Sequence, residues 1–235
     1  MMLFELLKEL LFPRKCILCG KVLSSQETDL CHGCRTDTPE FIPEDRRFPH
    51  IYSVCALWYY EIMVRESLLR YKFHNKPGYA SGYGPLLALK IAREMNGFDL
   101  ITWVPVSRKR RKERGYDQSE LLARAVSREL GIPVAGTLRK VRDNPAQSGI
   151  QDRAKRLENV KDAYAPVEDA AIPGKRVLLI DDILTPGATA SECARTLLRA
   201  GAEQVSLAVV AAGREKQKDK EYDFHTSDET ETVLF

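Results

Sequence analysis

Two adjacent carboxylates, Asp181 and Asp182, follow an apolar run at residues 177–180 and precede a short loop with two threonines. The run is typical of a buried strand, so the carboxylates are expected at its carboxyl end. There they could accept hydrogen bonds from vicinal ribose hydroxyls, or hold a divalent cation beside a pyrophosphate. Loop N–H groups and the hydroxyls of Thr185 and Thr189 would cradle a phosphate. The stretch predicts a sugar-phosphate site; two acids that merely cap the next helix are the simpler alternative.

A second group that could do chemistry is a cluster of cysteines near the N-terminus. They form two CxxC pairs, namely Cys16 with Cys19 and Cys31 with Cys34. Each pair can direct two sulfurs at one tetrahedral ion, and together they leave no position for a water molecule. The spacing predicts a structural zinc ion, with a redox or disulfide role as the alternative. His32 lies between two of these cysteines and is expected to be a bystander, while Cys55 and Cys193 are expected to be small buried residues.

Positive charge is concentrated in two segments. Residues 108–116 read RKRRKERGY, and residues 139–161 hold seven basic and three acidic side chains. We expect both to be loops near the carboxyl ends of parallel strands, where they could neutralise a pyrophosphate. The same loops could follow a nucleic-acid backbone, and a solvated charged face is the third alternative. Nearby aromatic residues could then stack on bases, although such residues more often fill a core; they are Tyr59, Tyr60, Tyr71, Phe73 and Tyr83.

The elements that must position these groups alternate between strand and helix. We expect strands over 51–60, 99–106, 134–141, 176–180 and 205–212, and helices over 62–72, 85–96, 117–130 and 189–200. Residues 74–85 are rich in Gly and Pro and are expected to be a loop. Alternation with continuous apolar strands predicts an α/β fold, a parallel sheet flanked by helices. In such sheets ligands bind beyond the carboxyl ends of the strands, where the acid pair is expected.

The composition restricts the class of protein. The chain has 235 residues, 44% of them hydrophobic, and a net charge of +3, which excludes a disordered chain and a histone-like polycation. Residues 108–161 nevertheless hold 15 basic and 7 acidic side chains, a local charge of +8. We expect an N-terminal helix and zinc module over 1–40, a linker over 41–50, the α/β domain over 51–214 and an acidic tail over 215–235.

The location of the protein is predicted from two features that the sequence does not show, a transmembrane segment and a signal peptide. No apolar run approaches the roughly 18 residues that a transmembrane helix needs. The N-terminal segment MMLFELLKELLFP has helical spacing of leucines but no basic start and no small-residue cleavage site. We therefore expect no membrane span and a cytoplasmic location, where the cysteines stay reduced.

The acid pair and its loop resemble the phosphoribosyl diphosphate (PRPP) motif of type I phosphoribosyltransferases. The resemblance implies that Asp181 and Asp182 hold the ribose hydroxyls and that Mg²⁺ accompanies PRPP. It also implies that the loop grips the 5-phosphate through Thr185, Gly187, Ala188 and Thr189. Two departures matter: Pro186 lacks an N–H where the family has a donor, and Thr185 replaces the Asp of purine-salvage enzymes, which argues against a 6-oxopurine substrate.

Three further blocks extend this resemblance. LLRYKFHN (68–75), VPVSRKRRKERGYDQSELLA (104–123) and LRKVRDNPAQSGIQDRAKRLENV (138–160) are similar to blocks of the bacterial ComF family. That family joins an N-terminal four-cysteine zinc module to a phosphoribosyltransferase-like domain and includes proteins needed for competence. The resemblance covers residues 6–213.

The ComF resemblance implies roles for residues outside the PRPP motif. A pyrophosphate loop falls on Val106, Ser107 and Arg108. A flexible loop over the site contains Gln147, Arg153, Arg156 and Asn159. Lys72, Arg142 and Arg156 are the further expected ligand contacts.

The function expected from this resemblance is PRPP binding combined with natural competence, meaning the handling of incoming single-stranded DNA. Expected partners are PRPP or a related ligand, single-stranded DNA and proteins of the competence machinery. Two alternatives remain open. One is an active phosphoribosyltransferase that transfers phosphoribose to an unidentified acceptor and releases pyrophosphate, without a covalent nucleophile. The other is a regulator that responds to PRPP.

Overall fold

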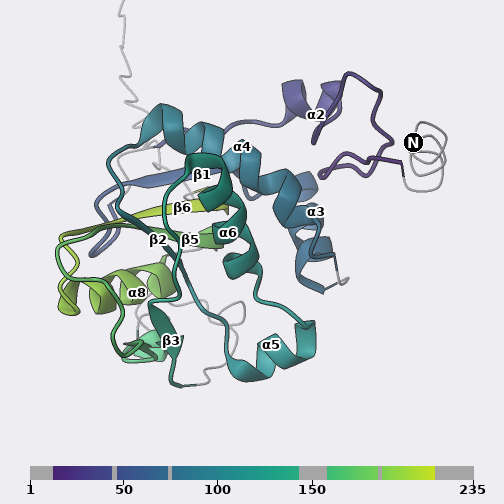
Figure 1. Ribbon diagram of the computed structural model, residues 1–235. Helices are drawn as coiled ribbons and strands as arrows, with labels where there is room; N and C mark the ends of the chain where they lie inside the picture. Colours follow the sequence, from purple (N-terminus) through teal and green to yellow (C-terminus); the bar gives the residue numbers. More distant parts are fainter. Residues whose placement is uncertain (1–12, 44–46, 74–75, 143–157, 185–186, 215–235) are drawn as a thin grey trace, which may run out of the picture.

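A parallel four-stranded sheet forms the centre of the protein in the computed structural model, which describes residues 13–43, 47–73, 76–142, 158–184 and 187–214. Its strands are β1 (Val54–Tyr59), β2 (Leu100–Trp103), β5 (Arg176–Leu184) and β6 (Gln204–Ala212), in the order β1-β6-β5-β2. All three pairings are parallel. The α/β architecture with helices on the sheet is therefore confirmed (Figure 1).

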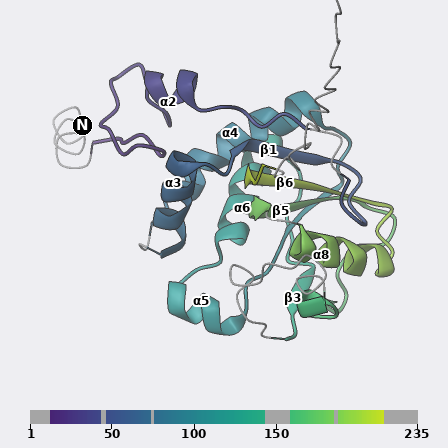
Figure 2. The same ribbon diagram turned by 180° about the vertical axis from the view of Figure 1, so that it is seen from behind.

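Helices cover both faces of this sheet. One core contains α3 (Ile62–Phe73), α4 (Tyr79–Glu94) and α6 (Gln118–Leu130) with every second strand residue, including Leu178 and Ile180. The other core contains α8 (Ala188–Arg199) with the alternate residues Val177 and Leu179. Burial on both sides is why the strands read as continuous apolar runs. Figure 2 shows the two layers from behind.

A small second sheet lies beside α8. It is antiparallel and pairs β3 (Leu138–Lys140) with β4 (Tyr164–Pro166). The strand expected over 134–141 is thus shorter than predicted, and Val134 makes only an isolated bridge to Ile101. Two further helices, α2 (His32–Asp37) and α5 (Arg108–Arg114), lie at opposite ends of the molecule in both ribbon views (Figures 1 and 2).

One expected loop is partly a helix. Helix α4 begins at Tyr79 and runs through Pro85, so the prediction of a loop over 74–85 is wrong for its second half. The glycines there allow close packing. A Cβ on Gly84 would lie 2.4 Å from Cβ of Ala125, and one on Gly82 would lie 2.7 Å from Cγ2 of Ile17. Glycine here brings α4 against α6 and the N-terminal module, a role that composition alone does not separate from a turn.

The segment expected as a linker, 41–50, contributes to the core. Phe41 and Phe48 are buried, and the N–H of Phe41 donates to the carbonyl of Leu57 at 3.0 Å. The expected N-terminal helix, apart from Pro13, lies outside the described residues, and so does the expected acidic tail. The cysteines of the expected zinc module are described. The domain boundaries stay predictions. Within the described ranges, no helix is both long and apolar enough to cross a membrane.

Candidate ligand site at the carboxyl ends of the strands

The acid pair lies inside β5 and not after it. The strand continues through Asp181 and Asp182 to Leu184, because its backbone pairs with β6 as far as Ala212. Both carboxylates line a cavity of about 1190 Å³ beside the ends of β2 and β5. Of the predicted ligand contacts, this cavity brings together Lys72, Val106, Asp181, Asp182, Gly187 and Thr189.

An ion pair joins Asp182 to helix α3. Nζ of Lys72, in the last turn of α3, lies 2.9 Å from Oδ1 of Asp182. Both side chains are mostly buried, at 18% and 11% exposed, so solvent screens the pair less than it would at the surface. The LLRYKF block therefore supplies a cation at the acid pair itself.

Asp181 is held by hydrogen bonds from two donors. Its Oδ1 accepts from Oγ of Ser119 at 2.8 Å and from the N–H of Asp182 at 2.9 Å. Burial, followed by the negative charge of Asp182, raises the pKa of Asp181 to about 7, although Lys72 and the two donors oppose the shift. Near neutral pH this carboxyl can therefore either accept or donate a hydrogen bond.

Asp117 connects the predicted pyrophosphate loop to α6. It is the N-cap of that helix, and its Oδ1 accepts from the N–H groups of Ser119 and Glu120. Its Oδ2 accepts from the N–H of Val106 at 3.0 Å. Burial raises the pKa of Asp117, and these N–H donors oppose that shift. The RGYDQ block thus positions Val106 and Ser119 through one buried side chain.

The same block also holds the end of α3. The Tyr71 hydroxyl donates to the carbonyl of Gln118 at 2.7 Å, and the Tyr116 hydroxyl donates to the carbonyl of Tyr71. Nη1 of Arg114 donates to Oε1 of Gln118 at 2.9 Å. These contacts fix the last turn of α3, and with it Lys72, relative to α6.

Glycine is required at the start of α8. Gly187 has a φ of +83°, and a Cβ there would lie 2.4 Å from Cδ1 of Phe48. Thr189, in the first turn, lines the cavity, whereas Ala188 is buried outside its lining. Thr185 and Pro186 lie outside the described residues.

The first basic segment is a helix, so the prediction of a loop over 108–116 is wrong there. Ser107 is the N-cap of α5, with its Oγ accepting from the N–H of Arg110 at 3.3 Å, and Gly115 ends the helix at a φ of +79°. No residue of α5 is buried, so the sequence has no apolar periodicity to reveal it. Arg110, Lys112 and Arg114 line the cavity, whereas Ser107 and Arg108 do not.

The second basic segment is described only at its two ends. Nη2 of Arg142 donates to the carbonyls of Lys161 at 2.7 Å and Asn159 at 3.3 Å, outside the cavity lining. Nη2 of Arg195 lies 2.6 Å from Oδ1 of Asp162 and ties this end to α8. Lys140 and Asn159 line the cavity. The predicted contacts Gln147, Arg153 and Arg156 lie outside the described residues.

The cavity also contains two residues for which the sequence predicts no role, Arg65 and Ser119. Arg110, Arg114 and Lys140, which line it too, belong to the two basic segments predicted to neutralise a pyrophosphate, and Phe73 belongs to the LLRYKF block. Of the aromatic residues predicted to stack on bases or fill a core, Tyr59, Tyr71 and Tyr83 are buried in the core. Tyr60 is half-buried and lines the cavity, and Phe73 is exposed and lines it too.

The four CxxC cysteines converge. Their sulfurs lie within 4.8 Å of one another, and Sγ of Cys19 lies 3.7 Å from Sγ of Cys31. A tetrahedral zinc ion with Zn–S bonds of about 2.3 Å separates its sulfurs by about 3.8 Å, so this cluster fits zinc. Burial opposes ionisation of Cys16, but N–H groups of Cys19, Cys31 and Leu18 lower the pKa of that thiol to about 7 overall. Cys55 and Cys193 are buried, as predicted.

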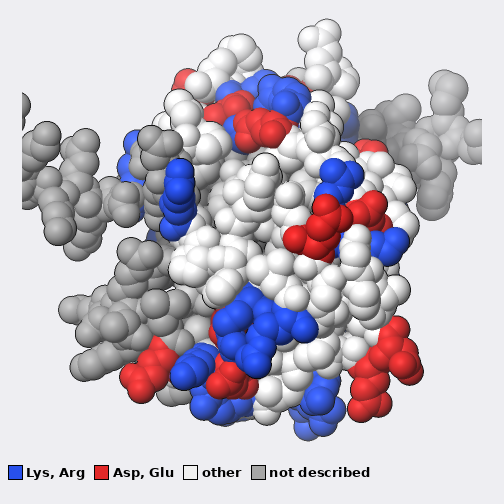
Figure 3. All heavy atoms as spheres, turned by 90° about the vertical axis from the view of Figure 1, so that its left-hand side faces the viewer, with Lys and Arg blue, Asp and Glu red and all other residues white. Residues whose placement is uncertain are grey.

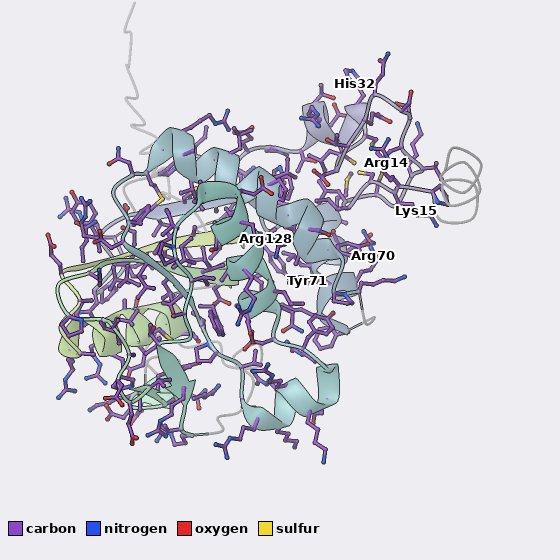
Figure 4. All side chains as sticks on the ribbon, viewed as in Figure 1. Arg14, Lys15, His32, Arg70, Tyr71 and Arg128 are labelled. Atoms are coloured by element: carbon purple, nitrogen blue, oxygen red, sulfur yellow. The ribbon has the colours of Figure 1, made fainter. Side chains whose placement is uncertain are left out.

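The zinc module is docked on α3. Oγ of Ser67 donates to the carbonyl of Ile17, and Nη2 of Arg70 donates to the carbonyl of Leu18. Both acceptors lie within the first CxxC turn. Figure 4 shows Arg70 toward the side of the module that carries Arg14 and Lys15, with Tyr71 turned toward the domain. Helix α3 therefore contacts the zinc module along its length and the acid pair at its end.

Comparisons with known proteins agree with this architecture. The phosphoribosyl transferase domain family matches residues 117–234, and the double zinc ribbon domain family matches residues 7–46. The chain is 25% identical to competence protein F of Haemophilus influenzae, over 83% of this chain and 96% of that protein. It is 28% identical to DNA utilization protein YhgH of Escherichia coli strain K12, over 82% of this chain and 87% of that protein.

Two further similarities were found. Competence protein ComFC of Bacillus subtilis is 23% identical over 79% of this chain and 89% of that protein. Among solved structures, glutamine PRPP amidotransferase from B. subtilis is 24% identical, with a TM-score of 0.42, and the match covers 60% of this chain and 30% of that one.

Proposed function

Because this chain belongs to the ComF family, in which a double zinc ribbon precedes a phosphoribosyl transferase domain, we propose that it binds PRPP with a divalent cation and handles incoming single-stranded DNA. One observation carries the proposal. Two neighbouring carboxylates, Asp181 and Asp182, line a cavity that cationic side chains also line. Carboxylates suit ribose hydroxyls and a hydrated cation, and cations suit phosphates, so one cavity offers both halves of a sugar phosphate their counterparts.

The acid pair would hold the ribose. Each carboxylate can accept hydrogen bonds from the 2- and 3-hydroxyls, and Ser119 already fixes the orientation of Asp181. Lys72 would pair with Asp182 and could turn its other N–H groups toward a phosphate of the ligand. A cation brought in with PRPP would neutralise the pyrophosphate beside this pair.

The phosphates would be bound at two further places. The start of α8 offers backbone N–H groups and the Thr189 hydroxyl to the 5-phosphate. Arg110 and Lys140, which enter the cavity from α5 and β3, would neutralise the pyrophosphate. Pro186 has no N–H to donate, so the donors before and at the start of α8 should bind the 5-phosphate more weakly than they would with a non-proline residue at position 186.

The role in DNA handling is supported by the relatives and by charge. One relative is named a DNA utilization protein, and two others are named competence proteins. In this chain, α5 carries exposed cations outside the cavity, among them Arg108 and Lys109. Cations at a helix surface bind phosphates of any sequence. The same end of the domain would therefore serve both PRPP and DNA.

Two measurements test this proposal. Calorimetric titration of the zinc-loaded full chain with Mg²⁺–PRPP should show saturable binding, and a labelled single-stranded oligonucleotide should bind with strong salt dependence. The absence of heat with Mg²⁺–PRPP, against a phosphoribosyltransferase as positive control, would overturn the proposal.

The reaction class is decided by a third measurement. Pyrophosphate is monitored while PRPP-bound protein is offered nucleobases, nucleosides and oligonucleotides. Release in any mixture identifies a phosphoribosyltransferase, in which the cations of the cavity stabilise the leaving group. Binding without release identifies a PRPP-binding or PRPP-responsive protein.

A further inference from the structure

Phe73 is an aromatic residue that the core does not use. It is the last residue of α3 and is 61% exposed, whereas the nearby Tyr71 and Tyr83 are 0% exposed. Its ring nevertheless belongs to the wall of the cavity that holds the acid pair. Burying a phenylalanine side chain is favourable, so its position at a cavity wall forgoes stability that a core position would give.

The ring is held in place from one side. The guanidinium of Arg114 lies 4.9 Å from the ring centroid, within the range of a cation–π contact. Arg114 is itself fixed by its hydrogen bond to Oε1 of Gln118, which is 0% exposed. Arg114 thus holds the ring from α5, and more than half of the residue stays open to solvent. In both ribbon views the end of α3 lies next to the end of α5 (Figures 1 and 2).

PRPP has no flat, uncharged group that would stack on such a ring. Its groups are phosphates, hydroxyls and a sugar ring, and the carboxylates and cations of the cavity already match them. Phe73 lines the same cavity as Lys72 and Asp182, so a group stacked on the ring would share that cavity with the proposed ribose. A flat, uncharged ligand group next to a ribose is a nucleobase, and every base has a face that stacks on an aromatic ring.

The charges around Phe73 match a phosphate backbone. Arg65, Arg110, Lys112 and Arg114 line the cavity with it, together with Glu113 and the acid pair. Arg108 and Lys109 continue the positive charge along the exposed side of α5. On the face seen from the left of Figure 1, groups of basic and of acidic side chains are both present (Figure 3). A stacking ring beside a cationic track is the arrangement by which proteins bind single strands.

We propose that Phe73, backed by Arg114, is the stacking platform for an unpaired base of a single-stranded nucleic acid whose phosphates follow α5. The placement of that base beside a ribose rests on the proposed PRPP site; the platform itself does not. Duplex DNA is disfavoured, because its paired bases cannot present a face to the ring.

The test compares Phe73→Ala with Tyr52→Ala, which removes a ring that is 75% exposed and is not part of the cavity lining. Binding of a labelled thymidine oligonucleotide is measured by fluorescence anisotropy. F73A should weaken binding about 5- to 150-fold, the range for one stacked base, while Y52A should leave it unchanged. An abasic oligonucleotide of equal length should bind the wild-type chain as weakly as the full oligonucleotide binds F73A.

A second variant reports contact directly. Phe73→Trp should retain affinity, and its tryptophan fluorescence, after subtraction of the wild-type signal from Trp58 and Trp103, should be quenched by the oligonucleotide but not by its abasic form. Equal binding of abasic and full oligonucleotides, or equal losses in F73A and Y52A, would overturn the platform. Quenching by free nucleosides as strong as by the oligonucleotide would overturn the strand as its ligand.

Titration of F73A with Mg²⁺–PRPP separates the two proposals. F73A should bind Mg²⁺–PRPP like the wild-type chain, because the ring contacts none of the groups assigned to it. A wild-type chain that fails to bind PRPP but shows the Phe73-dependent stacking would refute the proposed function and leave the platform standing.

Discussion

Nζ of Lys72 lies 2.9 Å from Oδ1 of Asp182, so a helix from the N-terminal half of the chain reaches the acid pair on the central strand β5. The same helix contacts the first CxxC turn through Ser67 and Arg70. Helix α3 therefore physically connects the zinc module and the proposed ligand site, and several predictions about the site can be made through its residues.

Removal of the Lys72 ammonium should weaken PRPP binding. Lys72→Ala leaves Asp182 without its cation and takes a positive charge from the cavity. Charge-assisted hydrogen bonds contribute about 1.5–3 kcal/mol, which corresponds to a roughly 10- to 150-fold loss of affinity. Calorimetry with Mg²⁺–PRPP measures the loss, and Lys72→Arg, which keeps the charge, should lose less. Affinity of K72A equal to that of the wild-type chain would contradict the assigned contact.

PRPP affinity should rise with pH around neutrality. The pKa of Asp181 is raised to about 7, and its ionised form is the one that accepts from both ribose hydroxyls and Ser119. Affinity should therefore fall as the pH is lowered from 8 to 6. In Asp181→Asn this dependence should disappear along with most of the affinity. A wild-type affinity that is flat across this range, once ligand ionisation is subtracted, would speak against Asp181 as a ribose contact.

Asp181 also predicts a pH dependence of stability, and its direction is opposite to that of the PRPP affinity. A carboxyl whose folded pKa is raised keeps its proton in the folded state at pH values where the unfolded chain has lost it. The free energy of unfolding should therefore decrease as pH rises from about 4 to about 7, and this contribution should be absent from D181N. Urea denaturation of both proteins at several pH values measures it; parallel curves for the two would be the contrary result.

Loss of zinc should loosen α3 more than the rest of the domain. Chelation releases the CxxC turn whose carbonyls accept from Ser67 and Arg70. Amide hydrogen exchange should speed up in α3 while α8, on the other face of the sheet, stays protected. The double variant Ser67→Ala/Arg70→Ala should reproduce the α3 effect with zinc still bound. Uniform exchange across both helices after chelation would show instead that the module stabilises the whole domain.

Asp117 should matter more for stability than an ordinary helix cap. Asp117→Ala removes the N-cap of α6, which costs about 0.5–2 kcal/mol, and it also frees the N–H of Val106. Ser107→Ala, which removes the cap of the short exposed helix α5, is the matched control and should cost less. Thermal unfolding compares the two. A smaller effect from D117A than from S107A would contradict the role assigned to Asp117.

The sequence predicted the elements with apolar periodicity and missed those without it. Strands β5 and β6 and helices α6 and α8 were found because burial imposes a pattern on their residues. Helix α5 buries no residue, so its sequence predicts a loop. The start of α4 also predicts a loop, because the glycines that allow its close packing are equally typical of turns.

Individual site residues could be predicted only where they lie close together in the sequence as part of a motif. Asp181, Asp182 and the cysteines carry their spacing in the sequence. The contacts of Ser119 with Asp181 and of Asp117 with Val106 join residues that the fold brings together, so no local pattern contains them. Arg142 shows the converse: a basic residue in a site-like block donates to the backbone of its own loop.

The central claim is that the acid pair of β5 binds Mg²⁺–PRPP, and ligand protection of the fold tests it most directly. Thermal unfolding of the wild-type chain and of Asp181→Asn/Asp182→Asn is measured with and without Mg²⁺–PRPP. At a ligand concentration 100 times its Kd, the wild-type chain should gain about 2.7 kcal/mol of stability, and the double variant should gain none. Equal stabilisation of both proteins by Mg²⁺–PRPP would show that the ligand binds elsewhere.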